Sequence, residues 1–423
     1  MRNIIEVLEE RGFIDAITSE DLRKLVEKPI KVYCGFDPTN SSLHIGNMVG
    51  LMALKWFQSH GHTPVAIVGG ATGMIGDPSG KSSERQLLDE ETIQKNTDGI
   101  RKNIEKLLCF EGENGAIILN NYDWFKEFSF VSFLRDVGKY FRVGSMLAKE
   151  SVKARLSSEE GMSFTEFSYQ LLQGYDFLHL FQTDSVLLQI GGSDQWGNIT
   201  AGTELIRKVT GKTAYGLTFP LLTRSDGQKF GKSEKGAIWL SPERLPAYDF
   251  YQYLVRVADA DVINLMRLLT CMEMNEILQY AESLKTGTHE PNAAQKRLAE
   301  EVTRMLHGEE GLKKALQLTL DAAPGSKTVL NAQTLETLVN EMPSKSLPLE
   351  DLMHVALIDI IASIGLLPSK GEARRFLRNG GIYLNNEKVE DENLLLTPDN
   401  LIDGKFLLLA AGKKNKIVIK AVP

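Results

Sequence analysis

The feature that most constrains the fold is an alternation of short apolar strands with longer amphipathic helices in the first half of the chain. Strands are predicted at 32–34, 64–68, 116–119, 186–190 and 216–222, and helices at 44–60, 90–108, 131–141, 164–181 and 196–210. This alternation is typical of a parallel sheet covered by helices, which binds ligands at the carboxyl ends of its strands. We therefore expect an α/β, Rossmann-like parallel sheet with its ligand site at that edge.

The remainder of the chain predicts further domains, because 423 residues exceed one typical domain. The sequence is helical in character from 246 to 320, and a final unit combines two helices with four short strands. We expect the α/β domain at 1–222 and a lysine-containing loop with an all-helical domain at 223–320. A loop-rich linker at 321–347 and a small α+β domain at 348–423 complete the expected organisation.

Composition narrows the function classes. A formal net charge of −7 argues against a protein that coats nucleic acid non-specifically. The N-terminus is an acidic amphipathic helix rather than a signal peptide, and no apolar run approaches the roughly 18–20 residues that span a bilayer. Cys34, Cys109 and Cys271 are far apart and form no CxxC pair, which speaks against a disulfide framework and a structural zinc site. We expect a cytoplasmic protein with no membrane partner and no protein-ligated metal.

The stretch 31–47 has the features of an anion site. Its strand breaks at Gly35, Asp37 opens a polar loop, and the first turn of the next helix carries His44, Gly46 and Asn47. Unpaired backbone N–H groups and the helix dipole favour anions at such a junction. His44 and Asn47 share one helix face, and Gly46 allows close approach of a planar group. The alternative is an ordinary loop-to-helix junction with a solvated histidine.

Two glycine-containing loops are candidate phosphate binders. The segment 69–85 resembles a P-loop, but only three residues separate its glycines and Ile75 stands where the first glycine should be. A Walker A site is therefore rejected. A later loop carries Lys229 and Lys232, with glycines next to Ser233, and it is suited to close over phosphates. A solvated basic loop is the alternative for that segment.

The helix at 164–181 carries a narrow polar stripe. Tyr169, Gln173 and Asp176 repeat on one face of an otherwise apolar helix, and the stripe holds no Lys or Arg. A solvated face of an amphipathic helix is one interpretation. A buried polar stripe would need partners, and a polar ligand could supply them.

Basic residues are grouped in the last unit. Residues 345–423 hold 11 Lys and Arg against 10 Asp and Glu, so this unit is close to neutral. Arg374, Arg375 and Arg378 nevertheless lie on one predicted helix, and Lys413, Lys414 and Lys416 in one turn. Such grouping is what phosphate contacts require, although a solvated surface explains it equally well.

Taken together, the motifs resemble those of a known enzyme family. His44-Ile45-Gly46-Asn47 and the later Lys229–Ser233 segment resemble the paired HIGH and KMSKS signatures of class I aminoacyl-tRNA synthetases. The intervening GGATGMIGDPSG, NNYDW, SFTEFSYQLLQGYDF and IGGSDQWGNITAG closely match bacterial tyrosyl-tRNA synthetases, and the final unit looks like a small RNA-binding domain first described in a ribosomal protein. Two departures stand out: Asn47 replaces the second His, and Phe230-Gly231 replaces Met-Ser, a variation that bacterial tyrosyl enzymes share.

The resemblance implies a two-step reaction. The tyrosine carboxylate attacks the α-phosphate of ATP, giving tyrosyl-adenylate and pyrophosphate, and the tyrosyl group then passes to the 3′-terminal adenosine of tRNA(Tyr). Such chemistry needs positioning and fixed positive charge rather than a nucleophile. Mg²⁺ is expected to accompany ATP without a dedicated protein cage. The family binds tRNA across a homodimer, and the helix at 131–141 is the expected dimer face.

The resemblance also implies a set of site residues. The expected catalytic residues are Thr39, His44, Asn47, Lys229, Lys232 and Ser233. ATP is expected to contact Cys34, Gly35, Asp37, Gly46, Gly192, Asp194 and Lys232. For tyrosine, Tyr33 and Asp176 would bind the phenol and Asp77, Tyr169 and Gln173 the ammonium, with Asn121 and Gln195 completing the lining. Individually weaker candidates for tRNA contacts are Lys81, Arg85, Arg207, Lys208, Arg374, Arg375, Lys413 and Lys414.

Two other functions are compatible with parts of this sequence. Tryptophanyl-tRNA synthetases share the expected fold, but they are usually shorter and would not be expected to pair Tyr33 with Asp176. An RNA-binding or splicing protein that no longer uses its active site would have no reason to keep His44, Asp176 and Lys232. Both rivals are therefore less favoured than a tyrosyl enzyme.

Overall fold

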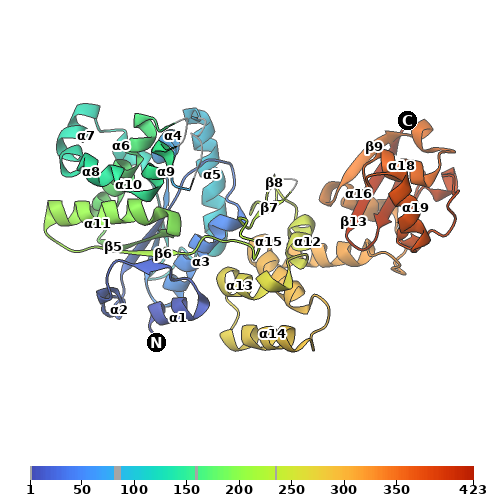
Figure 1. The fold of residues 1–423 in the computed structure, drawn as a ribbon, viewed down its shortest axis with the longest axis horizontal. Helices are drawn as coiled ribbons and strands as arrows, with labels where there is room; N and C mark the ends of the chain where they lie inside the picture. The colour runs from blue at the N-terminus through green and yellow to red at the C-terminus, as the bar shows by residue number, and fades with distance from the viewer. Residues whose placement is uncertain (1, 81–86, 158–160, 234–235) are drawn as a thin grey trace. The chain divides into compact units, whose positions relative to one another are not determined.

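The computed structural model describes residues 2–80, 87–157, 161–233 and 236–423 (Figure 1). The chain divides into two compact units. Unit 1 comprises Met1–Arg244 and Val257–Leu306, and unit 2 comprises Leu245–Arg256 and His307–Pro423. No helix in the described ranges is both long enough and apolar enough to cross a lipid bilayer.

A six-stranded sheet forms the centre of unit 1, in the order β1-β6-β5-β2-β3-β4. Its strands are β1 (Ala16–Ile17), β2 (Lys31–Phe36), β3 (Thr63–Val68), β4 (Ile117–Asn120), β5 (Val186–Gly192) and β6 (Tyr215–Phe219). Strands β2 to β6 run parallel, and the short edge strand β1 is antiparallel to β6. Chain order reverses between β2 and β5, which is where such sheets bind ligands. The predicted parallel α/β sheet is confirmed.

Helices cover both faces of this sheet. α3 (Ile45–Ser59) and α5 (Glu90–Leu107) lie on one side of the strands, and α10 (Phe164–Thr183) and α11 (Trp196–Thr210) on the other (Figure 1). α3 packs on β2 and β3 and is buried along most of its length, and α10 packs on α11 and β5. Right-handed crossover connections produce this division, because the chain moves across the sheet in opposite directions from β2 and from β5.

Shorter helices fill the connections of unit 1. They are α1 (Ile4–Arg11), α2 (Asp21–Leu25), α4 (Thr72–Ile75), α6 (Tyr122–Phe125), α7 (Phe130–Asp136), α8 (Val143–Leu147), α9 (Glu150–Leu156), α13 (Asp259–Leu269), α14 (Met274–Thr286) and the first part of α15 (Ala293–Asp321). The helix predicted at 131–141 is wrong in its extent, since α7 ends at Asp136 and a 3₁₀ turn follows at Gly138–Tyr140. Glycine is a poor helix former, which accounts for this early end.

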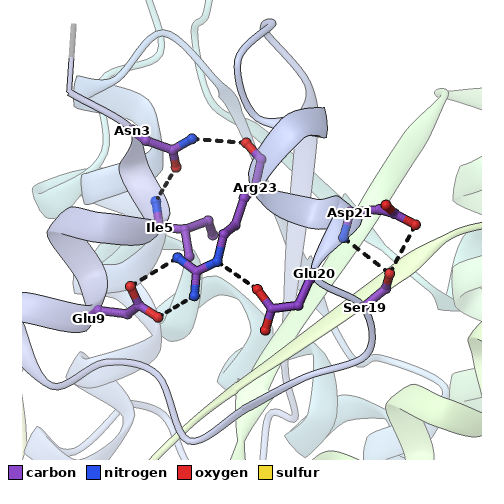
Figure 2. Close-up of polar contacts among 7 residues, drawn as sticks. All are labelled: Asn3, Ile5, Glu9, Ser19, Glu20, Asp21 and Arg23. Atoms are coloured by element: carbon purple, nitrogen blue, oxygen red, sulfur yellow. Dashed lines mark hydrogen bonds and ion pairs between the residues drawn. The ribbon is translucent and has the colours of Figure 1, made fainter.

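The N-terminal segment is fastened to the chain that leads into β2 (Figure 2). Asn3 caps α1 by accepting from the Ile5 N–H at 2.9 Å, and its amide donates to the Arg23 carbonyl at 2.9 Å. The Arg23 guanidinium, in α2, binds the carboxylates of Glu9 and Glu20. These bonds join α1 to α2 immediately before β2, the central strand that carries several of the expected site residues.

Unit 2 is built on a five-stranded sheet in the order β11-β10-β12-β13-β9. Its elements are α12 (Ala247–Val255), the second part of α15, α16 (Ala332–Glu341), β9 (Ser344–Pro348), α17 (Leu349–Leu352), α18 (Leu357–Ser363), α19 (Lys370–Arg378), β10 (Ile382–Leu384), β11 (Glu387–Lys388), β12 (Phe406–Ala411) and β13 (Asn415–Val422). The helix α15 lies largely within the region 246–320 that was predicted to be helical, and it consists of two halves. Gly308, at φ 74° and ψ 177°, separates these halves with a conformation that glycine tolerates.

The segment 321–347, expected as a linker, contains two packed elements. Leu335 and Leu338 of α16 share one apolar core with Phe406 and Val418, and β9 pairs in parallel with β13. Tyr248 of α12 lies in the same core, although it precedes the rest of the unit in the chain. The loop-rich composition around α16 conceals these elements, because their packing partners lie far away in the sequence.

Candidate active site

The turn between β2 and α3 is closed by its own side chains. The His44 N–H donates to Asn47 Oδ1 at 3.1 Å, and His44 Nδ1 accepts from the Gly46 N–H at 3.1 Å. This reciprocal capping box fixes the helix N-terminus. A Cβ at Gly46 would lie 2.9 Å from His44 Cε1, so the imidazole occupies the space of a side chain there. Asn47 therefore has a definite structural task at the position where the family signature has histidine.

The lysine-containing hairpin lies directly beside this turn. β7 (Lys232–Ser233) pairs with β8 (Gly236–Ala237), and the Ile45 N–H donates to the Ile238 carbonyl at 2.8 Å. Gly231 has a φ of 91°, and a Cβ there would lie 2.5 Å from Ile45 Cγ2. Only glycine suits both conditions, which gives a physical reason for Gly231. The two signature segments, remote in sequence, are neighbours in the fold.

Lys229 extends the site toward the end of β5. Its Nζ lies 3.5 Å from the Gly80 carbonyl, and the side chain itself is exposed. Burial and Asp77 raise the pKa of Asp194, and the positive charge of Lys229 opposes that shift. A lysine and two carboxylates therefore lie at the carboxyl edge of the sheet. Lys232 is also exposed, whereas only the backbone of Ser233, in β7, is described.

A buried carboxylate marks the deep end of the site. Asp176 of α10 is 4% exposed and accepts from Asn121 Nδ2 at 3.0 Å and from Trp124 Nε1 at 2.9 Å. Burial raises the pKa of Asp176 to about 8, although these two hydrogen bonds lower it. The polar stripe predicted on this helix is thus turned inward at Asp176 and Tyr169, and the solvated-face alternative is wrong for those two residues.

Tyr33 presents a second polar group at this end. Its side chain is 1% exposed, its ring packs edge-on against Phe177 at 5.3 Å, and its hydroxyl has no hydrogen-bond partner among the described residues. Burial, reinforced by the nearby charge of Asp176, raises the pKa of Tyr33 well above 10. A buried neutral hydroxyl without a partner is costly unless a ligand satisfies it.

A hydrogen-bonded chain connects the stripe to the loops after β2 and β3. The Tyr169 hydroxyl donates to Asp37 Oδ2 at 2.8 Å, and Thr72 Oγ1 donates to Asp37 Oδ1 at 2.8 Å. Asn121, which is fully buried, donates to Thr72 Oγ1 at 3.0 Å and accepts from the Ala71 N–H at 2.8 Å. Three expected site residues are thus held in one network.

A second network holds the remaining polar residues. Gln195 Nε2 donates to Asp77 Oδ2 at 2.7 Å. Asn198 Nδ2 donates to Gln173 Oε1 at 2.9 Å and lies 3.3 Å from Gln195 Oε1. The structure therefore brings Asp77, Gln173 and Gln195 together at the start of α11.

Three contributors to these networks were not predicted: Thr72, Trp124 and Asn198. Trp124 lies in the quoted NNYDW segment, but nothing in its spacing indicates a contact with Asp176. Thr72 and Asn198 acquire their roles only through partners on other elements. No local sequence signal identifies them.

The other expected ATP residues line the loop ends. Cys34 is buried against Gly50 of α3, and burial raises the pKa of its thiol to about 12, so the group is a neutral thiol. Gly35 and Thr39 are exposed. A Cβ at Gly192 would lie 2.8 Å from Asp194 Oδ1, so the absence of a side chain there gives that carboxylate its space.

The expected tRNA contacts are distributed over both units. Lys81 and Arg85 fall outside the described residues. Lys208 pairs with Glu204 at 2.9 Å, and Arg207 precedes it at the exposed end of α11. In unit 2, Arg374 pairs with Glu392 and Arg375 with Glu372, whereas Lys413 and Lys414 are exposed in the turn between β12 and β13.

The sequence is similar to two protein-family models and to curated proteins along nearly its whole length. Residues 24–322 match the family model "tRNA synthetases class I (W and Y)", and residues 334–419 match "Tyrosine--tRNA ligase SYY-like C-terminal domain". The chain is 64% identical over 421 residues to the tyrosine--tRNA ligase of Protochlamydia amoebophila, covering 99% of both chains. It is 46% identical to that of Bacillus caldotenax, again covering 99% of both.

Solved structures give the same picture. A C-terminally truncated mitochondrial tyrosyl-tRNA synthetase of Aspergillus nidulans aligns with a TM-score of 0.66 at 29% identity, covering 75% of this chain and 93% of that one. A tryptophanyl-tRNA synthetase of Encephalitozoon cuniculi aligns with a TM-score of 0.53 at 13% identity, covering 73% and 87%, and shows a shared fold alone.

The sheet, the paired signature segments and the matching family model together define a class I aminoacyl-tRNA synthetase of the tryptophan and tyrosine group. The match to the C-terminal family model and the full-length relatives distinguish the tyrosine enzymes from the tryptophan enzymes within this group. The chain belongs to the tyrosine--tRNA ligase family.

Proposed function

We propose that the chain activates L-tyrosine with ATP to tyrosyl-adenylate, releasing pyrophosphate, and then transfers tyrosine to the 3′-terminal adenosine of tRNA(Tyr). Family membership across both matched regions supports this reaction. The observation that carries the choice of amino acid is the buried pair of Tyr33 and Asp176. Tyr33 presents a hydroxyl without a partner in the described part of the chain, and Asp176 a carboxyl group of raised pKa.

Tyrosine recognition follows from that pair. The substrate phenol would donate to Asp176 and accept from the Tyr33 hydroxyl, which has no other partner among the described residues. Phenylalanine would leave that hydroxyl unpaired and give Asp176 no hydrogen bond, and a site built for a hydroxyl rejects the analogue that lacks it; tyrosyl enzymes are the known example of this effect. Asn121 holds the Asp176 carboxylate in place through its 3.0 Å hydrogen bond.

The substrate ammonium would lie nearer the surface. Asp77 would supply the opposite charge, and Tyr169 and Gln173 the neutral hydrogen bonds. The Gln195 amide donates to Asp77, which orients its carboxylate for this task. Tyr169, held by Asp37, is likewise positioned before substrate arrives.

Adenylate formation depends on positioned positive charge. ATP would lie along β2, the start of α3 and the end of β5, against Cys34, Gly35, Asp37, Gly46, Gly192 and Asp194. Thr39, His44 and Asn47 would contact the phosphates at the N-terminus of α3, where the helix dipole favours anions. Lys229, Lys232 and Ser233 would close over the leaving pyrophosphate and stabilise its developing charge.

Mg²⁺ is proposed as the companion of ATP. Lys229 and Lys232, beside the proposed phosphate position, are exposed ammonium groups that suit phosphate oxygens rather than a cation. This fits a Mg²⁺ ion that is bound through the substrate phosphates and water, its usual arrangement in phosphoryl-transfer sites. Its part in the chemistry would be to neutralise charge on the triphosphate.

A homodimer is proposed through the surface of α7 and α8. Phe130, Val131 and Val143 are 67%, 73% and 62% exposed, and Leu134 and Leu147 of the same two helices are exposed as well. Exposed apolar side chains concentrated in this way are typical of a protein interface. The tRNA would contact Lys81, Arg85, Arg207 and Lys208 in unit 1 and Arg374, Arg375, Lys413 and Lys414 in unit 2.

The proposed location is the cytoplasm. All three cysteines are free thiols, and Cys109 and Cys271 are exposed. Exposed free thiols persist in reducing compartments.

Tyrosine-dependent ATP–pyrophosphate exchange tests the proposed function. Exchange with tyrosine but not with tryptophan or phenylalanine is the expected result. Exchange supported by tryptophan would favour the first rival, a tryptophanyl enzyme. Exchange with none of the three would favour an RNA-binding role that does not use the site.

A further inference from the structure

Backbone hydrogen bonds join the turn before α3 to the residues that follow the β7–β8 hairpin. The Leu240 N–H donates to the Leu43 carbonyl at 2.9 Å, and the Ile45 N–H donates to the Ile238 carbonyl at 2.8 Å. His44 and Trp239 form an antiparallel bridge between these two bonds. We call the turn between β2 and α3, which ends at His44, the histidine turn. We call residues 238–241 the brace, because this segment lies alongside the histidine turn and immediately follows β8.

Helix α5 contacts both the histidine turn and the brace through one side chain. Asn103 of α5 is fully buried, and its Oδ1 accepts from the Leu43 N–H at 2.8 Å and lies 3.1 Å from Ser42 Oγ. Its Nδ2 donates to Ser241 Oγ at 2.9 Å, and the Ser241 N–H donates to Ser42 Oγ at 3.1 Å. One side-chain amide therefore binds the histidine turn through its oxygen and the brace through its nitrogen.

This arrangement is more specific than packing requires. On the buried face of α5, Asn103 lies among the apolar side chains of Ile100, Ile104 and Leu107. A buried amide among them is costly unless every polar atom is satisfied, and a satisfied polar network favours one geometry over nearby alternatives. The amide oxygen and nitrogen of Asn103 thus fix the register between the histidine turn and the brace.

We propose that Asn103 is a positioning residue for amino-acid activation. By fixing the brace against the histidine turn, it sets the separation between the groups proposed to bind the two ends of the triphosphate. Charge stabilisation depends steeply on such separations, and a shift of about 1 Å costs about 100-fold in rate. The inference rests on the proposed function and adds to it a residue that touches no substrate.

The tyrosine pocket provides an independent reference. Asp176, Asn121 and Trp124 lie on α10 and in the segment after β4, and their hydrogen bonds involve neither the brace nor Asn103. Loss of the Asn103 contacts should therefore change the chemical step without changing tyrosine affinity. A residue that merely stabilised the fold would not separate these two quantities.

The experiment measures tyrosine-dependent exchange and tyrosine binding in Asn103→Ala, Ser241→Ala and the double variant. Each single variant should lower kcat about tenfold, with the tyrosine Kd within about twofold of the unaltered chain. The double variant should lose no more than about the larger single loss, because both substitutions break one shared contact. Ser241 is the less buried end of that contact, so it keeps the test valid if Asn103→Ala folds poorly.

Gln295→Ala is the matched control. Gln295 is a buried amide in the same unit that donates to the Val257 carbonyl at 3.2 Å and to Asp259, away from both signature segments. Its loss should lower stability without the tenfold fall in kcat. Hydrogen exchange at the Leu240 and Ile45 amides should accelerate in Asn103→Ala and not in Gln295→Ala.

Three results would overturn the proposal: unaltered kcat in both single variants, an equal fall in Gln295→Ala, or a parallel loss of tyrosine affinity. If the unaltered chain supports no tyrosine-dependent exchange, the proposed function fails instead. Amide exchange at Leu240 and Ile45 then decides whether Asn103 holds the two segments together.

Discussion

At the scale of single residues, Asp176 connects recognition to stability. Its pKa is raised from 3.8 to about 8 by burial, so the folded state prefers the protonated carboxyl group. A raised pKa contributes stability that is complete below the unfolded value and is lost as pH rises through the folded one. The ligand-free protein should therefore become less stable, through this group, between about pH 4 and pH 8.

The variant Asp176→Asn tests this linkage. The free energy of unfolding of the ligand-free protein should fall relative to the variant as the pH rises over that interval, because only the natural residue titrates. Urea unfolding of both proteins at about pH 5 and about pH 8 measures the difference. A difference that does not vary with pH would contradict the assigned environment. The variant should also lose tyrosine-dependent exchange.

Residues that belong to a motif could be proposed as site residues from the sequence, whereas those defined by tertiary contact could not. His44 and Lys229 were found from the spacing of their signatures, and Asp176 from its place in a polar stripe. Thr72 and Asn103 carry ordinary side chains in ordinary helical sequence. Their importance comes from partners on other elements, so only the structure identifies them.

At the scale of elements, the contact between the lysine hairpin and α3 depends on Gly231. Alanine there would have a strained positive φ and a Cβ 2.5 Å from Ile45 Cγ2, so the hairpin must move away from the histidine turn. Gly231→Ala should lower the kcat of exchange at least about tenfold and leave tyrosine affinity unchanged.

Gly227 provides the control for that substitution. It also has a positive φ, 82°, but a Cβ there would meet nothing within 4 Å. Gly227→Ala therefore introduces backbone strain of about 1 kcal/mol without the collision. An equal loss of kcat in both variants would show that strain, rather than the contact with α3, limits the hairpin.

Long elements were predicted well because their periodicity is local, as α3, α5 and α10 illustrate. The short helices α8 and α9 and the strand β9 were missed. An element of five or seven residues carries too few periods to be recognised, and β9 is a strand only because β13 lies beside it. The same reason explains why 321–347 was expected to be a linker.

At the scale of the whole molecule, self-association is the first prediction. The double substitution Phe130→Asp and Val131→Asp places charge on the proposed dimer face and should yield a monomer in sedimentation experiments. Leu278→Asp, at an exposed leucine of α14, is the control and should leave the association state unchanged. If the double variant is still a dimer, the dimer interface does not lie on the surface of α7 and α8.

The basic turn of unit 2 gives the second prediction. Lys413→Ala with Lys414→Ala should raise the KM for tRNA in aminoacylation and leave tyrosine-dependent exchange unchanged. The dependence of log affinity on log salt should become shallower by about 1.5, because two phosphate contacts are lost. Lys285→Ala, at an exposed lysine of α14, serves as the control. An unchanged salt dependence would show that the turn does not contact RNA.

The route of the chain between the two units has a consequence for how the enzyme could be shortened. The backbone enters unit 2 at Leu245, leaves it at Arg256 and re-enters at His307. A chain that ends after Leu306 would therefore keep α12 but lose the residues of unit 2 that pack against Tyr248. A viable minimal enzyme must retain the second half of α15 or replace the apolar face of α12 with polar side chains.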